Sequence, residues 1–316
     1  MTFDRVELDF HLTHWKRVTG GGMVLSDLVE PSLRRRAIWM LMVTAFLWSS
    51  SGLFVKLLSW GPLAIWGVRS LVATAVFWLY FRPQKLRWTR LQLVGALGYM
   101  GAQLFFIMGN KIAPTANIIF LSYTAPVYII LLGYWVLGER PLRGDWLTMP
   151  IIFAGMLLFF GDDLSFGAFR GNVLGVLSGL SMAVMVLSMR RQKAANPGHT
   201  ILLGNILGAL IGLPFAFGEP LTVTSVGIIL YLGVFQIGLS FILYSFAIKQ
   251  LEALESTLLL TLEPILSPLW VFLVLGEVPG PLATAGAALV LLAVVLRAVL
   301  SARTAVSPAA PVVNSQ

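Results

Sequence analysis

Long apolar runs alternate with short breaks through the central part of this chain. A helix that crosses a bilayer needs about 20 consecutive, mostly apolar residues. Breaks such as Gly61-Pro62, Arg82-Pro83 and Gly280-Pro281 carry turn signals. The pattern therefore predicts an all-α integral membrane protein with ten transmembrane helices joined by short connections. The predicted spans are 37–58, 62–81, 91–111, 115–137, 144–160, 172–190, 200–218, 226–248, 256–275 and 281–300.

The composition supports the membrane class. Hydrophobic residues make up 58% of the 316 residues, and charged residues only 11%. Because a soluble globule carries about a quarter charged residues, this chain lacks the polar surface of a soluble fold. It contains no cysteine, which excludes disulfides, thiolate metal ligands and cysteine nucleophiles. His11 and His14 lie three residues apart with no third ligand in view, so no metal site and no cofactor are predicted.

The net charge of +8 is distributed unevenly over the connections. If both termini are cytoplasmic, the cytoplasmic loops hold most of the basic residues, as the positive-inside rule requires. The charge is therefore interpreted as a topology signal in an inner or plasma membrane, and no nucleic-acid partner is expected. The cytoplasmic set is Arg82, Lys85, Arg87, Arg90, Arg140, Arg143, Arg190, Arg191, Lys193 and Lys249, against Lys111 and Arg170 on the opposite side.

Two polar tails, residues 1–36 and 301–316, lie outside the spans and are predicted to be cytoplasmic. The N-terminal tail begins with mixed charge and has no apolar stretch before the first span, unlike a signal peptide. Met23 follows three glycines and is a second candidate for the start of translation. The choice between Met1 and Met23 stays open at this point.

The spans divide into two five-helix units, residues 37–160 and 172–300, which share an internal repeat. Because five is an odd number, the second unit must cross the membrane in the opposite sense. Such inverted repeats are typical of secondary transporters, which bind their substrate near the bilayer midplane between the repeats. A shift of 138 residues superposes Gly95 on Gly233, Lys111 on Lys249, Leu121 on Leu259, Pro126 on Pro264, Val136-Leu137-Gly138-Glu139 on Val274-Leu275-Gly276-Glu277, and Pro141 on Pro279.

With this repeat, several short motifs resemble the drug/metabolite transporter superfamily, specifically its ten-helix EamA-type members. The resemblance covers about residues 37–300. Besides the paired Val-Leu-Gly-Glu boxes, it rests on Leu47-Trp48-Ser49-Ser50, Arg69 and Glu263-Pro264. It implies cytoplasmic termini and a substrate among amino acids, metabolites, nucleosides and drugs. The sixth span has Met182-Ala183 where Trp-Ala or Trp-Gly is common, so an aromatic pocket wall is expected in one half only.

Charged residues inside a membrane cost at least about 2.5–3.5 kcal/mol on insertion scales, so they are usually paired or face water. Four candidates occur: Lys56, Arg69, Lys111 and Glu263. The two lysines lie near span ends, where their stems can reach the interface, and a positioning role is predicted. Arg69 lies about 10 Å into the second span. It either binds a carboxylate or phosphate of the substrate or pairs with a neighbouring helix.

Glu263 stands in the middle of the ninth span, directly before Pro264. A proline in a helix leaves the carbonyl four residues earlier, here that of Leu260, without its donor. A carboxyl beside such an opened turn can meet water, a cation or an amine, and burial favours its uncharged form. Glu263 is therefore predicted to carry a coupling proton or bind an amine. The alternative is a fixed ion pair with Arg69 or Lys56.

Polar and aromatic residues around the two prolines complete the predicted site. The first half has Ala125-Pro126 where the second has Glu263-Pro264, so the acidic function is expected to be asymmetric. Pro126 and Pro264 are predicted hinges whose broken turns face each other across the pseudo-twofold axis. The predicted substrate and coupling residues are Glu263, Arg69, Trp48, Tyr123, Thr124, Thr261, Tyr244 and Gln236.

Glu139 and Glu277 end the two Val-Leu-Gly-Glu boxes, at opposite membrane faces. A helix dipole disfavours an anion at the C-terminus, whereas the free N–H groups at the start of a helix can donate to one. We therefore predict that each glutamate reaches the start of the next helix and clamps the end of its hairpin. A gating role is the alternative.

These features predict a secondary active transporter that exports a small organic metabolite, such as an amino acid or a drug-like compound, by alternating access. The expected partners are the lipid bilayer, the solute and a coupling proton, in a monomer or homodimer. A polytopic membrane enzyme or a scaffold is the alternative. The spans hold no cluster of histidine and acidic residues for metal-dependent catalysis and no Walker-type motif, so no catalytic residue is assigned.

Overall fold

The computed structural model describes residues 31–81, 89–138, 143–161, 166–192, 197–248, 250–251 and 253–306. Within these ranges the chain forms helices and contains no strand, which confirms the all-α prediction. Nine helical segments of the described chain are long and apolar enough to cross a membrane. The segment predicted at 144–160 is the exception, because its apolar helix covers only Trp146–Leu158.

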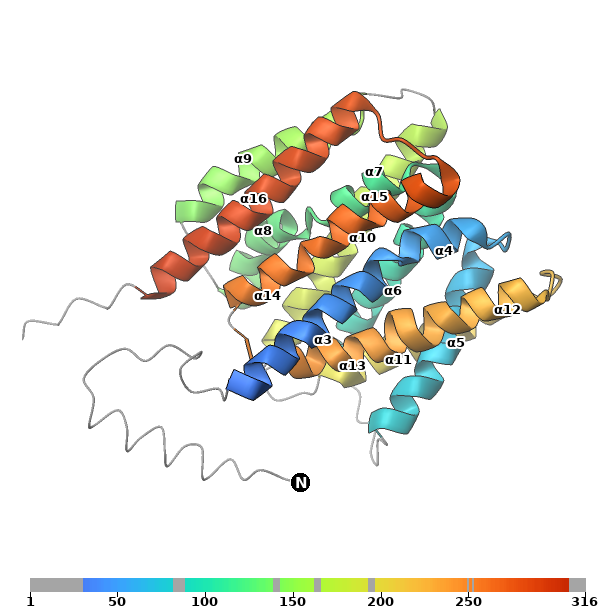
Figure 1. Ribbon diagram of the computed structural model, residues 1–316. Helices are drawn as coiled ribbons and strands as arrows, with labels where there is room; N and C mark the ends of the chain where they lie inside the picture. Colours follow the sequence, from blue (N-terminus) through green and yellow to red (C-terminus); the bar gives the residue numbers. More distant parts are fainter. Residues whose placement is uncertain are drawn as a thin grey trace, which may run out of the picture.

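The helices follow the predicted spans, and several spans consist of two or three consecutive helices (Figure 1). The first half contains α3 (Pro31–Ser49), α4 (Ser51–Leu57), α5 (Pro62–Phe81), α6 (Arg90–Ile112), α7 (Thr115–Ser122), α8 (Ala125–Leu137) and α9 (Arg143–Leu158). The second contains α10 (Phe166–Arg191), α11 (Pro197–Gly212), the 3-10 turn η1 (Leu213–Ala216), α12 (Val223–Leu230), the π-helical η2 (Tyr231–Leu239), α13 (Ser240–Ala247), α14 (Ala253–Leu260), α15 (Leu262–Leu275) and α16 (Pro281–Val306).

Equivalent helices of the two halves pack directly against each other. Helix α5 packs on α11, and α9 lies beside α16, the green and red pair in Figure 1. Glycines permit the close approach: a Cβ atom on Gly67 would lie 2.6 Å from the Cα atom of Gly212, and one on Gly155 would lie 2.9 Å from the carbonyl oxygen of Gly286. Small residues at such crossings let helix backbones touch. Glycine-mediated crossings therefore join these equivalent helices of the two halves.

Hydrogen bonds between helices repeat in both halves. The Thr44 hydroxyl of α3 donates to the carbonyl oxygen of Ser240 on α13 at 3.3 Å. The Ser178 hydroxyl of α10 donates to the carbonyl oxygen of Ala102 on α6 at 2.9 Å. The two hydroxyls are 134 residues apart in the sequence, and the two acceptors are 138 apart. The contact between α10 and α6 thus has an equivalent between α3 and α13. Such a pair of contacts is expected when the two halves are repeats of one five-helix unit.

The two helices with central prolines are interrupted at matching places. Tyr123 and Thr124 separate α7 from α8, and Thr261 separates α14 from α15. Both α8 and α15 end at a glycine in the left-handed conformation, Gly138 with φ 71° and Gly276 with φ 68°. Glycine is favoured there because it has no Cβ atom to clash. The glycines of the repeated boxes therefore serve as helix C-caps.

Large apolar side chains cover the outside of the bundle. Trp135, Leu157 and Leu273 are 74%, 72% and 62% exposed, respectively. Polar side chains, by contrast, are often buried: Arg69, Ser49, Asn205 and Thr124 are each 0% exposed. An apolar exterior around a polar interior is the arrangement that a lipid environment favours.

Candidate functional site

The two interrupted helices meet through Tyr123 and Glu263. The Tyr123 hydroxyl, at the end of α7, lies 2.8 Å from the Oε2 atom of Glu263 on α15. The same hydroxyl lies 3.4 Å from the carbonyl oxygen of Leu260. That is the carbonyl that Pro264 deprives of its helical donor. One tyrosine of the first half therefore contacts both the acid and the opened turn of the second half.

Glu263 has no basic partner within ion-pair distance among the described residues, whose ion pairs are Arg34–Glu255 and Lys56–Glu277. The fixed pair of Glu263 with Arg69 or Lys56, considered as the alternative, is thus not formed. Glu263 is partly accessible, whereas Pro264 beside it is buried. Its carboxyl group is held by a neutral hydroxyl and remains available to a small cation or a proton.

The threonines predicted for the site donate within their own helices. The Thr124 hydroxyl donates to the carbonyl oxygen of Leu121 at 2.5 Å, and the Thr261 hydroxyl donates to that of Leu258 at 2.6 Å. Both threonines are buried. Their hydroxyl hydrogens are used to satisfy carbonyls next to the two helix breaks, so they shape the broken turns and offer a ligand only an acceptor oxygen.

Arg69 on α5 is surrounded by amides. Its Nη2 atom donates to the Oε1 atom of Gln103 on α6 at 2.9 Å, and its Nη1 atom donates to the Oε1 atom of Gln236 on η2 at 3.3 Å. The Nε atom has no hydrogen-bond acceptor among the residues that the structure describes. The pairing with a neighbouring helix that was considered for Arg69 thus exists, but through neutral side chains. Gln103 was not assigned to the site from the sequence, although an amide in the middle of an apolar helix was a signal for it.

Trp48 and Tyr244 form an aromatic wall next to this cluster. The ring centroids of Trp48 lie 5.1 Å from Phe241 and 5.4 Å from Tyr244. The Trp48 Nε1 atom donates to the Ser240 hydroxyl at 2.7 Å, and this hydroxyl donates to the carbonyl oxygen of Gln236 at 2.5 Å. The aromatic wall and the Arg69 cluster therefore share the η2–α13 segment. The π-helical turn in η2 has no signal in the hydrophobic pattern.

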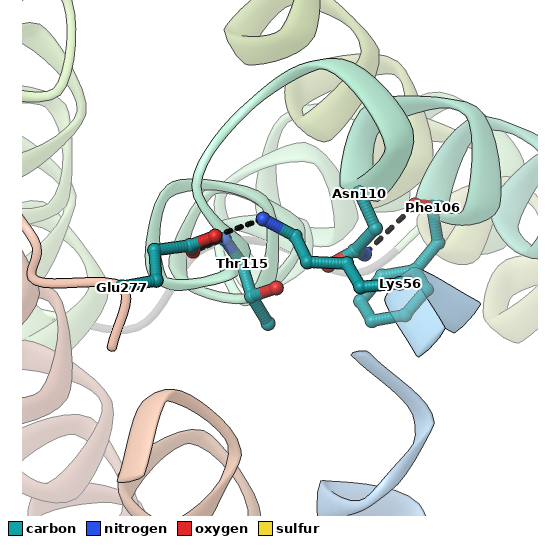
Figure 2. Close-up of polar contacts among 5 residues, drawn as sticks. All are labelled: Lys56, Phe106, Asn110, Thr115 and Glu277. Atoms are coloured by element: carbon teal, nitrogen blue, oxygen red, sulfur yellow. Dashed lines mark hydrogen bonds and ion pairs between the residues drawn. The ribbon is translucent and has the colours of Figure 1, made fainter. Parts of the chain in front are cut away.

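Glu277 clamps three helices at one end of the bundle (Figure 2). It forms an ion pair with Lys56 at the end of α4, and its Oε1 atom accepts a hydrogen bond from the Thr115 backbone N–H at 2.6 Å. Thr115 begins α7, so the carboxylate lies where a helix dipole favours an anion. The prediction that Glu277 reaches the next helix is wrong, because it binds the start of α7 in the other half. Glu139 lies outside the described residues.

The first span is bound to the ninth at three levels. At one end, the Arg34 side chain of α3 forms an ion pair with Glu255 of α14 at 2.5 Å. Further along, the Trp270 Nε1 atom of α15 donates to the Ser49 hydroxyl of α3 at 2.9 Å. At the other end stands the pair Lys56–Glu277. These contacts join α3 and α4 to α14 and α15 on both sides of the break at Thr261.

Comparison with known proteins agrees with this architecture. The model of the EamA-like transporter family matches the chain twice, at residues 35–161 and 169–298. The chain belongs to the EamA-like transporter family. The two matches correspond to the two halves described above, and the family resemblance inferred from the motifs is thereby confirmed.

Named relatives of this EamA-like chain are exporters. It is 24% identical over 267 residues to the threonine/homoserine exporter RhtA of Escherichia coli, covering 79% of this chain and 88% of the relative. It is 26% identical over 279 residues to a probable terminal-alkyne amino-acid exporter of Streptantibioticus cattleyicolor, covering 83% and 93%. A solved crystal structure matches with a TM-score of 0.60 at 19% identity, covering 84% of this chain and 98% of that one. This last likeness concerns the fold alone. The chain is thus a multi-pass membrane transporter.

Proposed function

We propose that this protein exports a small, amino-acid-like metabolite from the cytoplasm across the inner membrane by alternating access. The names of its relatives support the substrate class and the direction. The inverted five-helix repeat supports the mechanism, because rocking of two equivalent halves around a central site exposes it alternately to the two membrane faces. Both termini are proposed to be cytoplasmic, on the basis of the positive charge of the loops.

One observation carries the assignment of the coupling site: Glu263 meets Tyr123 at the junction of the two broken helices, without a basic partner among the described residues. A single carboxyl group can hold either a proton or the ammonium group of a solute, but not both. If the site must be occupied when it changes sides, entry of a proton drives exit of the solute. Glu263 is therefore proposed to perform the exchange.

The interruptions at Pro126 and Pro264 are proposed to be the hinges of this motion. Each proline deprives one carbonyl of its helical donor. Beside the breaks, the Thr124 and Thr261 hydroxyls donate to carbonyl oxygens of the preceding turns. Because the backbone hydrogen bonds of the helix are already interrupted at such a turn, the turn can bend without breaking them. Glu277 is proposed to hold one end of the bundle closed, since its contacts to Lys56 and Thr115 join both halves.

Transport in proteoliposomes tests the proposal. The purified protein is reconstituted, and efflux of radiolabelled L-threonine and L-homoserine is measured with and without an inwardly directed proton gradient. We expect efflux to accelerate when the gradient is imposed, and to return to the passive rate after a protonophore is added. Efflux of these and the other natural amino acids at the rate of empty liposomes would contradict the proposed substrate class.

The orientation has an independent test. The chain lacks cysteine, so single cysteines at Gln84 and Asp163, two positions outside the described residues, report the side on which each loop lies. In intact cells, a membrane-impermeant maleimide should label position 163 and leave position 84 unmodified until the membrane is opened. Labelling of both positions in intact cells, or of neither, would contradict the inverted arrangement of the halves.

A further inference from the structure

The Arg69 guanidinium carries its charge inside the bundle without an anionic partner among the described residues. Its side chain is 0% exposed, and the ion pairs of the described chain involve other residues. The Tyr99 hydroxyl, which interacts electrostatically with Arg69, is engaged with Asn205 at 3.4 Å. A buried cation is costly unless an opposite charge compensates it. A role limited to holding helices together leaves this charge uncompensated.

The hydrogen bonds of Arg69 leave one edge of the guanidinium open. An arginine has five N–H donors, and the structure gives acceptors to one donor on Nη1 and one on Nη2. The Nε donor is buried and has no acceptor within the part of the chain that the structure describes. The Nε atom and an Nη atom together form the fork that binds a carboxylate through two parallel hydrogen bonds. The unsatisfied edge thus has the geometry of a carboxylate site.

The position of the cluster connects it to the proposed transport site. Gln103, which accepts from Nη2, is partly accessible, whereas Gln236 is buried. Gln236 is joined through Ser240 to the aromatic wall at Trp48. A ligand arriving from the accessible side meets the Gln103 amide before it meets Arg69. Because this amide is neutral and belongs to a flexible side chain, an anion can replace its oxygen.

We propose that Arg69 binds the carboxylate group of the transported solute, which displaces the Gln103 amide oxygen and engages the Nε edge. The proposal rests on the function proposed above and narrows its substrates to monocarboxylates, including amino acids. A single guanidinium surrounded by neutral amides matches one negative charge. Amino-acid amides, which have the same shape without that charge, are excluded because they leave Arg69 uncompensated.

Ligand binding to the full-length protein in detergent tests this assignment without any transport step. Thermal unfolding is followed with each of the twenty L-amino acids and with L-threonine amide as the uncharged analogue of L-threonine. We expect at least one amino acid to raise the Tm of the wild-type protein, since binding to the native state stabilises it. Its amide should bind about 10–100-fold more weakly, the loss expected for hydrogen bonds to a charged group.

The decisive variant is Gln103→Glu, which supplies an internal carboxylate where an amide oxygen already lies 2.9 Å from Nη2. This carboxylate compensates Arg69 and competes with the ligand. The variant should keep or exceed the wild-type Tm and lose about 10–100-fold in amino-acid affinity. Gln92→Glu on the same helix is the matched control, because a capping-box position accepts glutamate, and its affinity should stay at the wild-type value.

Arg69→Lys is a second test, since it keeps the positive charge and removes the paired N–H donors of the guanidinium. It should weaken binding of the amino acid at least tenfold and leave binding of the amide unchanged. Equal binding of amino acid and amide, or a Gln103→Glu variant that binds like the wild type, would overturn the assignment. So would the absence of any amino-acid binding to the wild-type protein. If amino-acid binding depends on Arg69 but the protein shows no gradient-driven efflux, the proposed proton coupling is wrong and the carboxylate site stands.

Discussion

The two interrupted helices have the same backbone design and different chemistry. In both, a turn before a proline is broken, a threonine hydroxyl satisfies a nearby carbonyl, and a left-handed glycine ends the second segment. The first half places Tyr123 and Ala125 around its break, and the second places Glu263 there. The backbone features recur in both halves, as two equivalent hinges in the proposed alternating access would require. The acid stands at one of the two breaks only, Glu263 against Ala125, as the proposed exchange of one proton at one carboxyl group requires.

A second contrast separates the charges at the ends of the bundle from those at its centre. Lys56 and Glu277 neutralise each other at one end, and Arg34 and Glu255 do so elsewhere along the same pair of spans. The central Glu263 and Arg69 contact only neutral groups in the described chain. Paired charges hold helices together, whereas an unpaired charge can still form an ion pair with a ligand.

Removal of the central acid Glu263 is expected to have the largest effect on transport. Glu263→Gln keeps the side-chain volume and removes the proton-binding site, so gradient-driven efflux should fall at least about 100-fold, as for loss of an essential proton-transfer group. Glu255→Gln, which neutralises a peripheral acid, is the matched control and should keep most of the activity. Full gradient-driven efflux by Glu263→Gln would place the coupling elsewhere.

Transfer of the acid to the equivalent position in the first half sharpens the comparison. The double variant Ala125→Glu with Glu263→Ala restores the number of carboxyl groups but removes the acid from the Tyr123 hydroxyl. We expect efflux to stay as low as in Glu263→Gln, measured in the same liposomes. Recovery to more than half of the wild-type rate would mean that the halves are chemically interchangeable.

The Tyr123 hydroxyl has a smaller expected effect. Tyr123→Phe removes its hydrogen bonds to Glu263 and to the Leu260 carbonyl. A hydrogen bond to a charged group is worth about 1.5–3 kcal/mol, so the efflux rate should fall by about 10–100-fold. Tyr231→Phe is the control, because its hydroxyl is hydrogen-bonded to the Ser50 hydroxyl at 2.9 Å and Tyr231 is not among the predicted site residues. Equal efflux rates for the two variants would mean that the Tyr123 hydroxyl does not contribute to the function of Glu263.

The hinges are tested by Pro126→Ala and Pro264→Ala. Each substitution restores a helical donor, straightens its break and should slow turnover several-fold while membrane insertion stays intact, because an unbroken helix resists bending. Pro264→Ala should have the larger effect, since Glu263 adjoins it. Efflux is compared at equal protein per liposome. Unchanged efflux in both variants would mean that the prolines shape static helices and are not hinges.

The peripheral ion pairs should show the smallest effect, and on stability rather than transport chemistry. Lys56→Met leaves Glu277 without its cation in a contact whose side chains are 16% and 24% exposed. Unfolding free energy should fall by about 1–2 kcal/mol, between the values for exposed and buried pairs. Arg34→Met, in a pair with 43% and 26% exposure, should cost less. Thermal unfolding in detergent measures both, and the reverse order would contradict the burial argument.

The sequence alone determined the class of the protein and the positions of its helices. Uninterrupted apolar runs can be satisfied only as membrane helices, and the repeat of proline, glycine and glutamate positions at one spacing identified the halves. The broken turns at Pro126 and Pro264 were predicted as well, because a proline gives its helix no N–H donor. Such properties depend on neighbours along the chain, and so they can be read locally.

Tertiary structure decided which polar groups meet. The partner of Glu277 is Thr115 of the other half rather than the next helix, and the partners of Arg69 are Gln103 and Gln236 rather than Glu263. The helices of such a bundle can pair their charges in many ways at similar cost, because electrostatic attraction does not depend on sequence separation. Only the packing of α5, α6 and η2, governed by glycine contacts and the π-helical turn, selects one pairing. That selection leaves Arg69 and Glu263 without opposite charges in the described chain.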